Sequence, residues 1–473
     1  MPYSRTRIRT SSRRALADVV HAPYWLDRPI RPEPATSLVG ETTADLVIVG
    51  GGFTGLWTAL LAIEESPGLD VLVLEGDRLA EGASGRNGGF MAASITHGFG
   101  NGLARWPGEL AELIRLGHAN LDAIEATIER HGMQVDYLRA GELDVATEPH
   151  QVADLAGHAE LAAQYGEQLE FLDQAATRAM VDSPMYLASV LDRRGVAMVD
   201  PARLTWELAR VVRERGVRIH EHSAVIGLEG SEASVLVRTA HGSVRTPKVA
   251  LGTSAYPNLL RRVRPFIIPV YDYALMTEPL TDAQWQSVGW AFRGGIGDSN
   301  NQFHYTRPTA DGRILWGGFE AMYHYGSRMG ADLNRDDATN AVLAENFFQT
   351  FPQLEGLRFT HAWGGAIDTC SRFSAFWGTA MRGRVAYSVG YTGLGVGASR
   401  FGAQLMLDLL AGRQTERTRL EMARTRPIPF PPEPMRSPAV ALTRWSLDRA
   451  DNSAGRRNLW LRTLDRVGLG FDS

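Results

Sequence analysis

The chain has 473 residues, enough for two or three domains that each have their own core. With 44% hydrophobic residues, 22% charged residues and a net charge of -4, it has the composition of a globular protein and lacks the basic surplus typical of nucleic-acid binders. The single cysteine, Cys370, excludes internal disulfides and four-cysteine metal sites, and we expect no bound metal. No stretch approaches 18 uninterrupted apolar residues, so we expect no transmembrane segment and a cytoplasmic protein.

The first 40 residues form an arginine-rich arm that contains no acidic residue before Asp18. The twin arginines, Arg13 and Arg14, precede a segment that is too polar for an export signal. We expect a disordered or docked arm, with a transit peptide as the alternative.

A βαβ unit follows the arm. Residues 45–50 form a short apolar run typical of a buried parallel strand. Three glycines come next, then apolar residues at helical spacing up to Ile63, and a second buried strand over 70–75. A strand, a glycine turn, a helix and a strand within about 30 residues indicate a parallel sheet.

Later segments predict further elements of both kinds. Residues 102–133 form one long amphipathic segment. A helix is expected to start after Asp200 as N-cap, with Pro201 in its first position, and to end before Gly216. We expect strands of the same parallel class at 217–230, 234–240 and 248–253, and antiparallel strands at 269–280 and 302–321, the last with an Asp311–Gly312 hairpin turn.

The C-terminal part contains a strand, a glycine loop and a helix over 383–413, a proline-rich connector over 426–434, and a short amphipathic helix over 458–470. The order of elements predicts an α/β fold: a Rossmann-like dinucleotide-binding domain interrupted by an α+β substrate domain with a mixed antiparallel sheet. The expected limits are 1–40 for the arm, 41–101, 196–265 and 356–415 for the dinucleotide domain, 102–195 and 266–355 for the substrate domain, and 416–473 for the tail.

The motif Gly50-x-Gly52-x-x-Gly55 has the context that makes it specific. It follows a strand, opens a helix that starts with Phe53 and Thr54, and precedes an acid, Glu75, at the end of the next strand. The glycines permit a tight turn, close approach of a pyrophosphate, and close packing of helix on strand. The pyrophosphate would meet free N–H groups at the helix start, and Glu75 would bind the adenosine ribose. The motif predicts a dinucleotide site.

A second loop of small residues, Ser84 to Gly89 (SGRNGG), lies just after Glu75, and a simple NAD-binding turn does not need it. At this point the chain resembles the family of FAD-dependent amine and amino-acid oxidases (D-amino-acid oxidase-like, DAO), which includes glycine oxidase and sarcosine oxidase. Within the family, the GASGRNGG segment is most similar to the gamma-glutamylputrescine oxidase branch. The resemblance covers about residues 40–415 and rests on GGGFTG, SGRNGG, HSAVIGLE with VALGTSAY, and GYTGLGVG, in that order.

The resemblance implies noncovalently bound FAD. In addition to the first glycine motif and Glu75, it assigns to the cofactor the residues Ser84, Arg86, Asn87, Gly88, Val225, Gly252, Gly393, Leu394, Gly395 and Val396. Val225 would meet the adenine through its backbone, or it is simply strand core. The GYTGLGVG loop would face the flavin pyrimidine ring, where the start of the next helix stabilises negative charge; a glycine-rich loop without a ligand is the alternative.

Two lysines of sarcosine oxidase have no counterpart here. The position of the first, which holds the substrate carboxylate, aligns with Gly397, and the second activates oxygen over the flavin. Lys248 is this chain's only lysine and lies in a cofactor-domain segment. Either Arg or His replaces them, or oxygen is not the preferred electron acceptor. We expect Cys370 to be buried and inert rather than a tether for the flavin.

The substrate amine must lie over flavin N5 with its nitrogen unprotonated. Seven residues are candidates to contact it: His97, Tyr271, Tyr273, His304, Tyr305, Arg307 and Asp368. Tyr271 and Tyr273 share one face of their strand. Arg307 would clamp an acidic substrate group or form an ordinary ion pair. A structural role is open for each candidate, and it is favoured for His304.

The resemblance implies oxidation of a C–N bond in a primary or secondary amine, such as an amino acid or polyamine derivative. Hydride transfer to flavin N5 would give an imine that water hydrolyses. We favour an oxidase over a dehydrogenase that passes electrons to a protein or quinone. The third alternative is a flavoprotein that acts mainly as a docking partner through Trp460, Leu461, Leu464 and Val467; packing of these residues onto their own domain is favoured.

Overall fold

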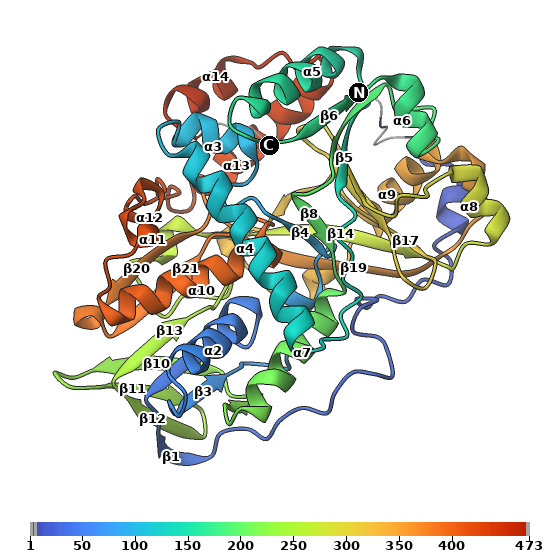
Figure 1. Cartoon of the computed structure of the whole chain (residues 1–473). Coiled ribbons are helices and arrows are strands. Elements are labelled where there is room, and N and C mark those ends of the chain that lie inside the picture. The colour runs from blue at the N-terminus through green and yellow to red at the C-terminus, as the bar shows by residue number, and fades with distance from the viewer. Residues whose placement is uncertain (1–2, 4–6, 470–473) are drawn as a thin grey trace.

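The computed structural model describes Tyr3 and residues 7–469 (Figure 1). Its first layer is a six-stranded sheet in which all strands except the first run parallel. The order of strands is β20 (Phe376–Ala380), β21 (Val385–Val389), β13 (Lys248–Leu251), β2 (Leu46–Val49), β3 (Val71–Leu74) and β9 (Arg218–His220). The βαβ unit and the C-terminal strand–loop–helix unit predicted from the sequence are therefore confirmed.

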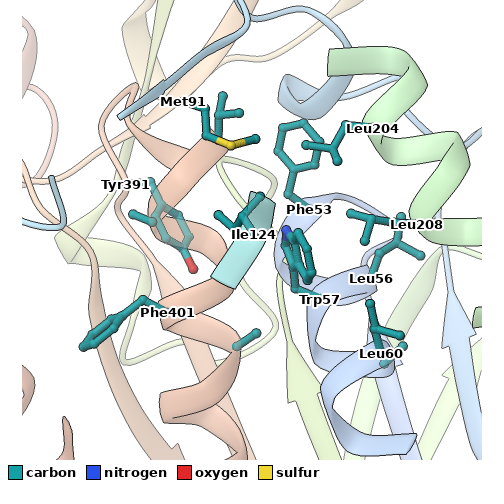
Figure 2. Close-up of a cluster of buried hydrophobic side chains, with 14 of the residues drawn as sticks. Phe53, Leu56, Trp57, Leu60, Met91, Ile124, Leu204, Leu208, Tyr391 and Phe401 are labelled. Atoms are coloured by element: carbon teal, nitrogen blue, oxygen red, sulfur yellow. The ribbon is translucent and has the colours of Figure 1, made fainter. Parts of the chain in front are cut away.

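Helices α2 (Phe53–Glu65), α7 (Pro201–Glu214) and α10 (Gly395–Ala411) share the core on one face of this sheet, and α4 (Leu110–Arg130) packs on α10. Figure 2 shows their apolar side chains meeting, with Trp57 of α2 and Ile124 of α4 between the outer helices. The start of α7 is as expected, because Asp200 accepts a hydrogen bond from the Arg203 N–H at 3.0 Å. The long amphipathic segment expected over 102–133 forms two helices, α3 (Phe99–Arg105) and α4, since Pro107 cannot continue a helix.

A four-stranded sheet covers the other face of the six-stranded sheet. Its order is β1 (Gly40–Thr43), β12 (Gly242–Thr246), β11 (Val235–Thr239) and β10 (Val225–Gly230), and β10, β11 and β12 are antiparallel. The prediction that β10 and β11 belong to the parallel class was wrong. Only a few residues connect β10 to β11 and β11 to β12, whereas parallel neighbours need a crossover of a dozen residues or more.

A nine-stranded mixed sheet forms the second half of the fold. Its path is β18 (Met322–Tyr323), β14 (Ile268–Thr277), β17 (Ile314–Gly318), β16 (His304–Pro308), β15 (Gly295–Asp298), β5 (Glu142–Ala146), β7 (Ala188–Asp192) and β6 (Leu169–Leu172), with β19 (Phe359–Thr369) paired to β14. The hairpin turn at Asp311–Gly312 joins β16 and β17, as predicted. β19 lies in the segment 356–415 that we expected in the dinucleotide domain, yet it pairs along its length with β14. The domain limits stay a prediction.

The two faces of the nine-stranded sheet have different surroundings. One face packs against α9 (Asp337–Thr350) in an aromatic-rich core that includes Tyr271, Tyr273 and Trp316. The other face shares a core with the helices of Figure 2, through Ala274, Met276 and Trp363. The ribbon of β4 (Phe90–Ala92) and β8 (Val196–Met198) lies between the two halves. Between the two terminal segments, the other α-helices are α5 (Pro149–Ala163), α6 (Gln174–Met180) and α8 (Asp282–Val288).

Both terminal segments dock on the molecule. In the N-terminal arm, which includes α1 (Thr10–Arg14), the Val20 N–H donates to the Thr360 carbonyl of β19 at 2.9 Å. The tail contains α11 (Glu416–Arg419), α12 (Glu421–Arg424), α13 (Arg436–Asp451) and α14 (Leu459–Arg466). Leu461 is buried against α13, beside the partly buried Trp460 and Leu464, whereas Val467 is exposed. Within residues 7–469, no helix is long and apolar enough to cross a membrane.

Candidate functional site

The first glycine motif forms a tight strand–helix junction. A Cβ atom at Gly55 would overlap the Gly50 carbonyl oxygen, and one at Gly50 would overlap the carbonyl oxygen of Gly252. A Cβ atom at Gly52 would lie 2.7 Å from Ser84 Oγ. The backbone of β2, α2 and the 252 turn therefore meets at van der Waals distance, as a dinucleotide-binding turn requires.

Glu75 is fixed at the end of β3. Its Oε2 accepts a hydrogen bond from the Gly51 N–H at 2.6 Å, and its Oε1 accepts one from the Asp77 N–H at 3.0 Å. Burial raises the pKa of this carboxyl. The Ser223 N–H donates to the Glu75 backbone carbonyl at 2.7 Å, which brings the chain that leads into β10 and Val225 next to the end of β3. This arrangement fits an adenosine-binding end.

The second loop is held from both sides. Ser84 Oγ accepts a hydrogen bond from the Phe53 N–H at 3.0 Å, which ties the loop to the first turn of α2. Asn87 donates to the Ala83 carbonyl and accepts from the Gly89 N–H at 2.8 Å. Arg86 forms an ion pair with Glu81 and donates to the Gly364 carbonyl of β19 at 3.1 Å.

The helices α2 and α10 both begin without a side-chain cap. The first turn of a helix carries N–H groups that have no partner within the helix, and it attracts negative charge. One of these groups in α2, the Phe53 N–H, donates to Ser84, and Thr54 Oγ1 donates to the Tyr391 hydroxyl at 3.2 Å. Because helix N-termini attract negative charge, the start of α2 fits the pyrophosphate of a flavin dinucleotide, and the start of α10 fits its anionic ring. Gly393, Leu394, Gly395 and Val396 lie at the start of α10.

Two predicted residues hold the loop that precedes α10. Asp368 Oδ2 accepts a hydrogen bond from the Gly390 N–H at 2.7 Å, and burial raises the pKa of this carboxyl to about 6. His97 Nε2 donates to the Thr392 carbonyl at 2.9 Å, and burial lowers the pKa of the imidazole. Gly397 abuts the Ala92 carbonyl oxygen, so no side chain fits at that position. The side chains of Asp368 and His97 therefore both position the loop that precedes α10.

One side of the nine-stranded sheet faces the second glycine loop, residues 84–89, and we call it the flavin-loop side. The structure does not bring Tyr271 and Tyr273 to this side. Both phenols lie in the core against α9, where Tyr273 donates to the Leu333 carbonyl at 2.9 Å and Tyr271 accepts from the Gly330 N–H at 3.2 Å.

His304 also lies in that core. Its ring stacks on Trp316 with 4.3 Å between centroids, Nδ1 donates to the Gly317 carbonyl, and Nε2 accepts from Asn346 at 3.0 Å. Burial lowers the pKa of His304 to about 3, so the ring is neutral. These contacts describe a structural histidine.

Arg307 faces the second loop, but its guanidinium is already engaged. Its Nη1 donates to the Gly89 carbonyl at 3.1 Å and to the Val199 carbonyl at 2.8 Å, and the guanidinium lies over the Trp25 ring at 5.7 Å. Burial lowers its pKa to about 10. Arg307 therefore fixes the loop through the backbone rather than offering a free carboxylate clamp.

Tyr305 has a partner, Asp272, that was not among the residues predicted from the sequence. Its hydroxyl donates to Asp272 Oδ2 at 2.8 Å, and Asp272 Oδ1 accepts from the Tyr273 N–H at 2.8 Å. Burial raises the pKa of Asp272 to about 6, against the lowering effect of the Tyr305 hydrogen bond.

This pair lies on the side of the sheet that faces the glycine loop. A Cβ atom at Gly88 would lie 2.8 Å from the Tyr305 ring. Gly365, which is opposite Asp272 in the β14–β19 ladder, would place a Cβ atom 3.4 Å from the Arg86 side chain. The signal in the sequence was the strict alternation in VYDYA, which places Asp272 on the face opposite to the two tyrosines.

Two further predictions concern cysteine and metal. Cys370 is buried, its thiol donates to the Ser374 carbonyl at 3.1 Å, and burial raises its pKa. Across the described part of the chain, no group of three or more His, Cys, Asp and Glu side chains could hold a metal ion.

The architecture has known relatives. A family model described as FAD dependent oxidoreductase (DAO) matches residues 45–409. Gamma-glutamylputrescine oxidoreductase of Escherichia coli (strain K12) is 33% identical over 404 residues, which cover 82% of this chain and 88% of that protein. The sarcosine oxidase beta subunit of Arthrobacter sp is 24% identical over 349 residues, covering 72% and 78%. The crystal structure of glycine oxidase from Geobacillus kaustophilus superposes with a TM-score of 0.68 at 19% identity, covering 82% of this chain and 99% of that one. The chain therefore belongs to the DAO family of FAD-dependent oxidoreductases.

Proposed function

We propose that this enzyme oxidises a C–N bond of a primary or secondary amine to an imine, which water then hydrolyses. The observation that carries the proposal is the Asp272–Tyr305 pair on the flavin-loop side of the nine-stranded sheet. A carboxylate in a desolvated site attracts a cationic amine and can accept its proton. The proposal is also supported by the 33% identity to gamma-glutamylputrescine oxidoreductase.

FAD, bound noncovalently, would supply the acceptor for the hydride, which takes the electron pair of the broken C–H bond with it. The chain's own residues bind and orient it. The backbone around Gly50 to Gly55 and the start of α2 would hold the pyrophosphate, Glu75 and Val225 the adenosine, and the start of α10 the flavin ring. Cys370 is no tether, because its thiol is buried and bonded to the Ser374 carbonyl.

Asp272 is the proposed base. An amine in water is protonated at neutral pH, and its nitrogen must lose that proton before the carbon–hydrogen bond breaks. With a pKa near 6, Asp272 is ionised at neutral pH and can take the proton at Oδ2, the atom that Tyr305 contacts at 2.8 Å. Tyr305 thereby positions the carboxylate.

We favour oxygen as the electron acceptor, with a dehydrogenase that uses a protein or quinone as the second candidate. One observation favours the second candidate: the only lysine, Lys248, is exposed at the first residue of β13. Ligands of parallel sheets bind at the opposite, carboxyl ends of the strands. No lysine is therefore available to activate oxygen, and the candidate for that role is partly buried His97, which contacts the loop before α10.

Turnover assays test the reaction and its acceptor together. The purified holoenzyme is incubated in air with glutamylated polyamines, N-methyl amino acids, simple amines and glycine, while carbonyl product and peroxide are measured. One carbonyl and one peroxide formed per amine consumed would support an oxidase. Carbonyl formation only with an added quinone or dye would support the dehydrogenase. Absence of carbonyl product with every amine and acceptor would contradict the proposal.

A further inference from the structure

Two tryptophan side chains hold successive carbonyl groups of the second glycine loop. The Nε1–H group of Trp363, on β19, donates to the Arg86 carbonyl at 2.8 Å. The Nε1–H group of Trp25, in the N-terminal arm, donates to the Asn87 carbonyl at 2.9 Å. Both indole rings are buried. The backbone of the loop is therefore fixed by side chains from two segments that lie far apart in the sequence.

These bonds determine which way two N–H groups of the loop point. In a trans peptide unit the C=O and N–H bonds point in opposite directions, and the peptide units of this loop are trans. The Arg86 carbonyl shares a peptide unit with the Asn87 N–H, and the Asn87 carbonyl shares one with the Gly88 N–H. The Asn87 N–H therefore points away from Trp363, and the Gly88 N–H points away from Trp25.

The N–H groups of Asn87 and Gly88 have no acceptor among the described residues. Neighbouring N–H groups of the same loop do: that of Arg86 donates to the Ala83 carbonyl, and that of Gly89 donates to Asn87 Oδ1 at 2.8 Å. Asn87 and Gly88 are only partly exposed, and backbone N–H groups away from water are rarely left without an acceptor. A bound group with acceptor atoms would satisfy both.

The place of these two N–H groups indicates which part of FAD they would meet. At one end of the loop, Ser84 accepts the Phe53 N–H at the start of α2, where the pyrophosphate fits. At the other end, a Cβ atom at Gly88 would lie 2.8 Å from the ring of Tyr305, the partner of Asp272. The two N–H groups lie at this second end, so their expected acceptors are nitrogen and oxygen atoms of the flavin ring.

Trp25 is itself held tightly in the arm. The Arg28 guanidinium lies over its ring at 5.8 Å, donates to its carbonyl at 3.2 Å and pairs with Asp200, the N-cap of α7. The Arg307 guanidinium lies over the same ring at 5.7 Å and donates to the Gly89 carbonyl. The arm lies outside the part of the chain that matches the family, so these contacts are additional to the family's cofactor domain.

We propose that Trp25 and Trp363 are positioning residues for FAD, because their indole N–H groups orient two peptide units whose own N–H groups, those of Asn87 and Gly88, donate to the flavin ring. The N-terminal arm is then part of the cofactor site. Loss of one indole bond would allow its peptide unit to rotate. Rotation would weaken the hydrogen bond to the ring and change the polar surroundings of the flavin.

The variants Trp25→Phe and Trp363→Phe test this inference, since each removes an indole N–H and keeps an aromatic ring. Titration of the apoprotein with FAD gives the dissociation constant, and the visible absorption bands report the surroundings of the flavin ring. We expect each variant to raise the dissociation constant by about two- to tenfold, the range for one hydrogen bond, and to shift the bands. Wild-type affinity and spectrum in both variants would overturn the inference.

Trp290→Phe is the matched control. The Trp290 indole is also buried, but it donates to the Gly294 carbonyl at 3.2 Å in the core on the other side of the nine-stranded sheet. This variant should lose thermal stability in the same way as the other two and retain the wild-type FAD affinity and spectrum. An equal loss of affinity in Trp290→Phe would show that the effect is general destabilisation and would contradict a positioning role.

A double-variant cycle gives an independent readout. Because Trp25 and Trp363 act on adjoining peptide units of one loop, their combined replacement should raise the dissociation constant by less than the product of the single effects. Trp25→Phe combined with Trp290→Phe should give the product. Simple products in both pairs would contradict a shared loop. The two tryptophans lie on separate segments, so poor folding of Trp25→Phe would leave Trp363→Phe as a test.

These measurements use FAD and no substrate, so they are separate from the proposed amine oxidation. If Trp25→Phe and Trp363→Phe lose affinity and shift the bands while no amine is oxidised by the wild type, the proposed function fails and the positioning role stands. If the wild type oxidises amines but neither variant differs from it in affinity or spectrum, the positioning role fails alone.

Discussion

The hydroxyl of Tyr305 donates a 2.8 Å hydrogen bond to Asp272, a carboxylate whose neighbours in sequence, Tyr271 and Tyr273, point to the other side of the sheet. This pair joins β16 to β14 across β17, where Gly317 leaves room for the ring. It places a group that can take a proton beside the loop that follows the first glycine motif. The activity of the enzyme should therefore depend on Asp272 in a defined way.

Replacement of Asp272 by Asn should slow flavin reduction by amine at least about 100-fold, because general-base catalysis contributes that much. In the wild type, kcat/KM should rise with pH through about 6, since Asp272 accepts a proton only when ionised. Tyr305→Phe should move this inflection to higher pH, because the Tyr305 hydrogen bond lowers the pKa of Asp272. Stopped-flow reduction across pH measures both effects. An unchanged profile in Tyr305→Phe would contradict the assignment.

Gly55→Ala should abolish FAD binding and destabilise the fold by about 1–3 kcal/mol, because the added methyl group would overlap the Gly50 carbonyl oxygen. Flavin absorbance after purification and thermal unfolding measure these effects. Gly157→Ala, a helical position on α5 with open space around it, is the matched control and should retain its flavin. Full FAD content in Gly55→Ala would disprove the tight junction.

Asp368→Ala should weaken FAD binding and cost about 1–3 kcal/mol of stability, because the buried Gly390 N–H loses its acceptor. The loop before α10, which would hold the flavin ring, would then be less well positioned. Asp368→Asn retains an acceptor oxygen and should have an intermediate effect. Titration of the apoprotein with FAD provides the dissociation constants, and equal affinity in wild type and Asp368→Ala would refute the positioning role.

His304 should make the protein sensitive to acid. Its pKa is lowered to about 3 in the folded state, whereas an unfolded histidine titrates near 6.5, so the unfolded chain binds more protons between these values. Stability should therefore fall as pH drops below about 6.5, by up to about 1.4 kcal/mol per pH unit from this group. His304→Gln should remove that slope in thermal unfolding, whereas a substitution of exposed His241 should not. Parallel slopes for wild type and His304→Gln would show that another group is responsible.

The sequence predicted the cofactor half of the fold better than the substrate half, for physical reasons. The tight turn at Gly50 to Gly55 and the acid at Glu75 follow from local constraints that any dinucleotide site imposes. Alternation shows that Tyr271 and Tyr273 share a face, but only tertiary packing determines which face meets the flavin loops. Asp272 was missed for that reason. The prediction that β10 and β11 belong to the parallel class failed because the same residue types favour strands in parallel and in antiparallel sheets.

The most direct test of the account is an anaerobic titration of the purified holoenzyme with amines, followed at the visible absorbance bands of the bound flavin. The account predicts that an amine bleaches the flavin in wild type but only very slowly in Asp272→Asn. A flavin that no amine bleaches, or that bleaches equally fast in Asp272→Asn, would contradict it.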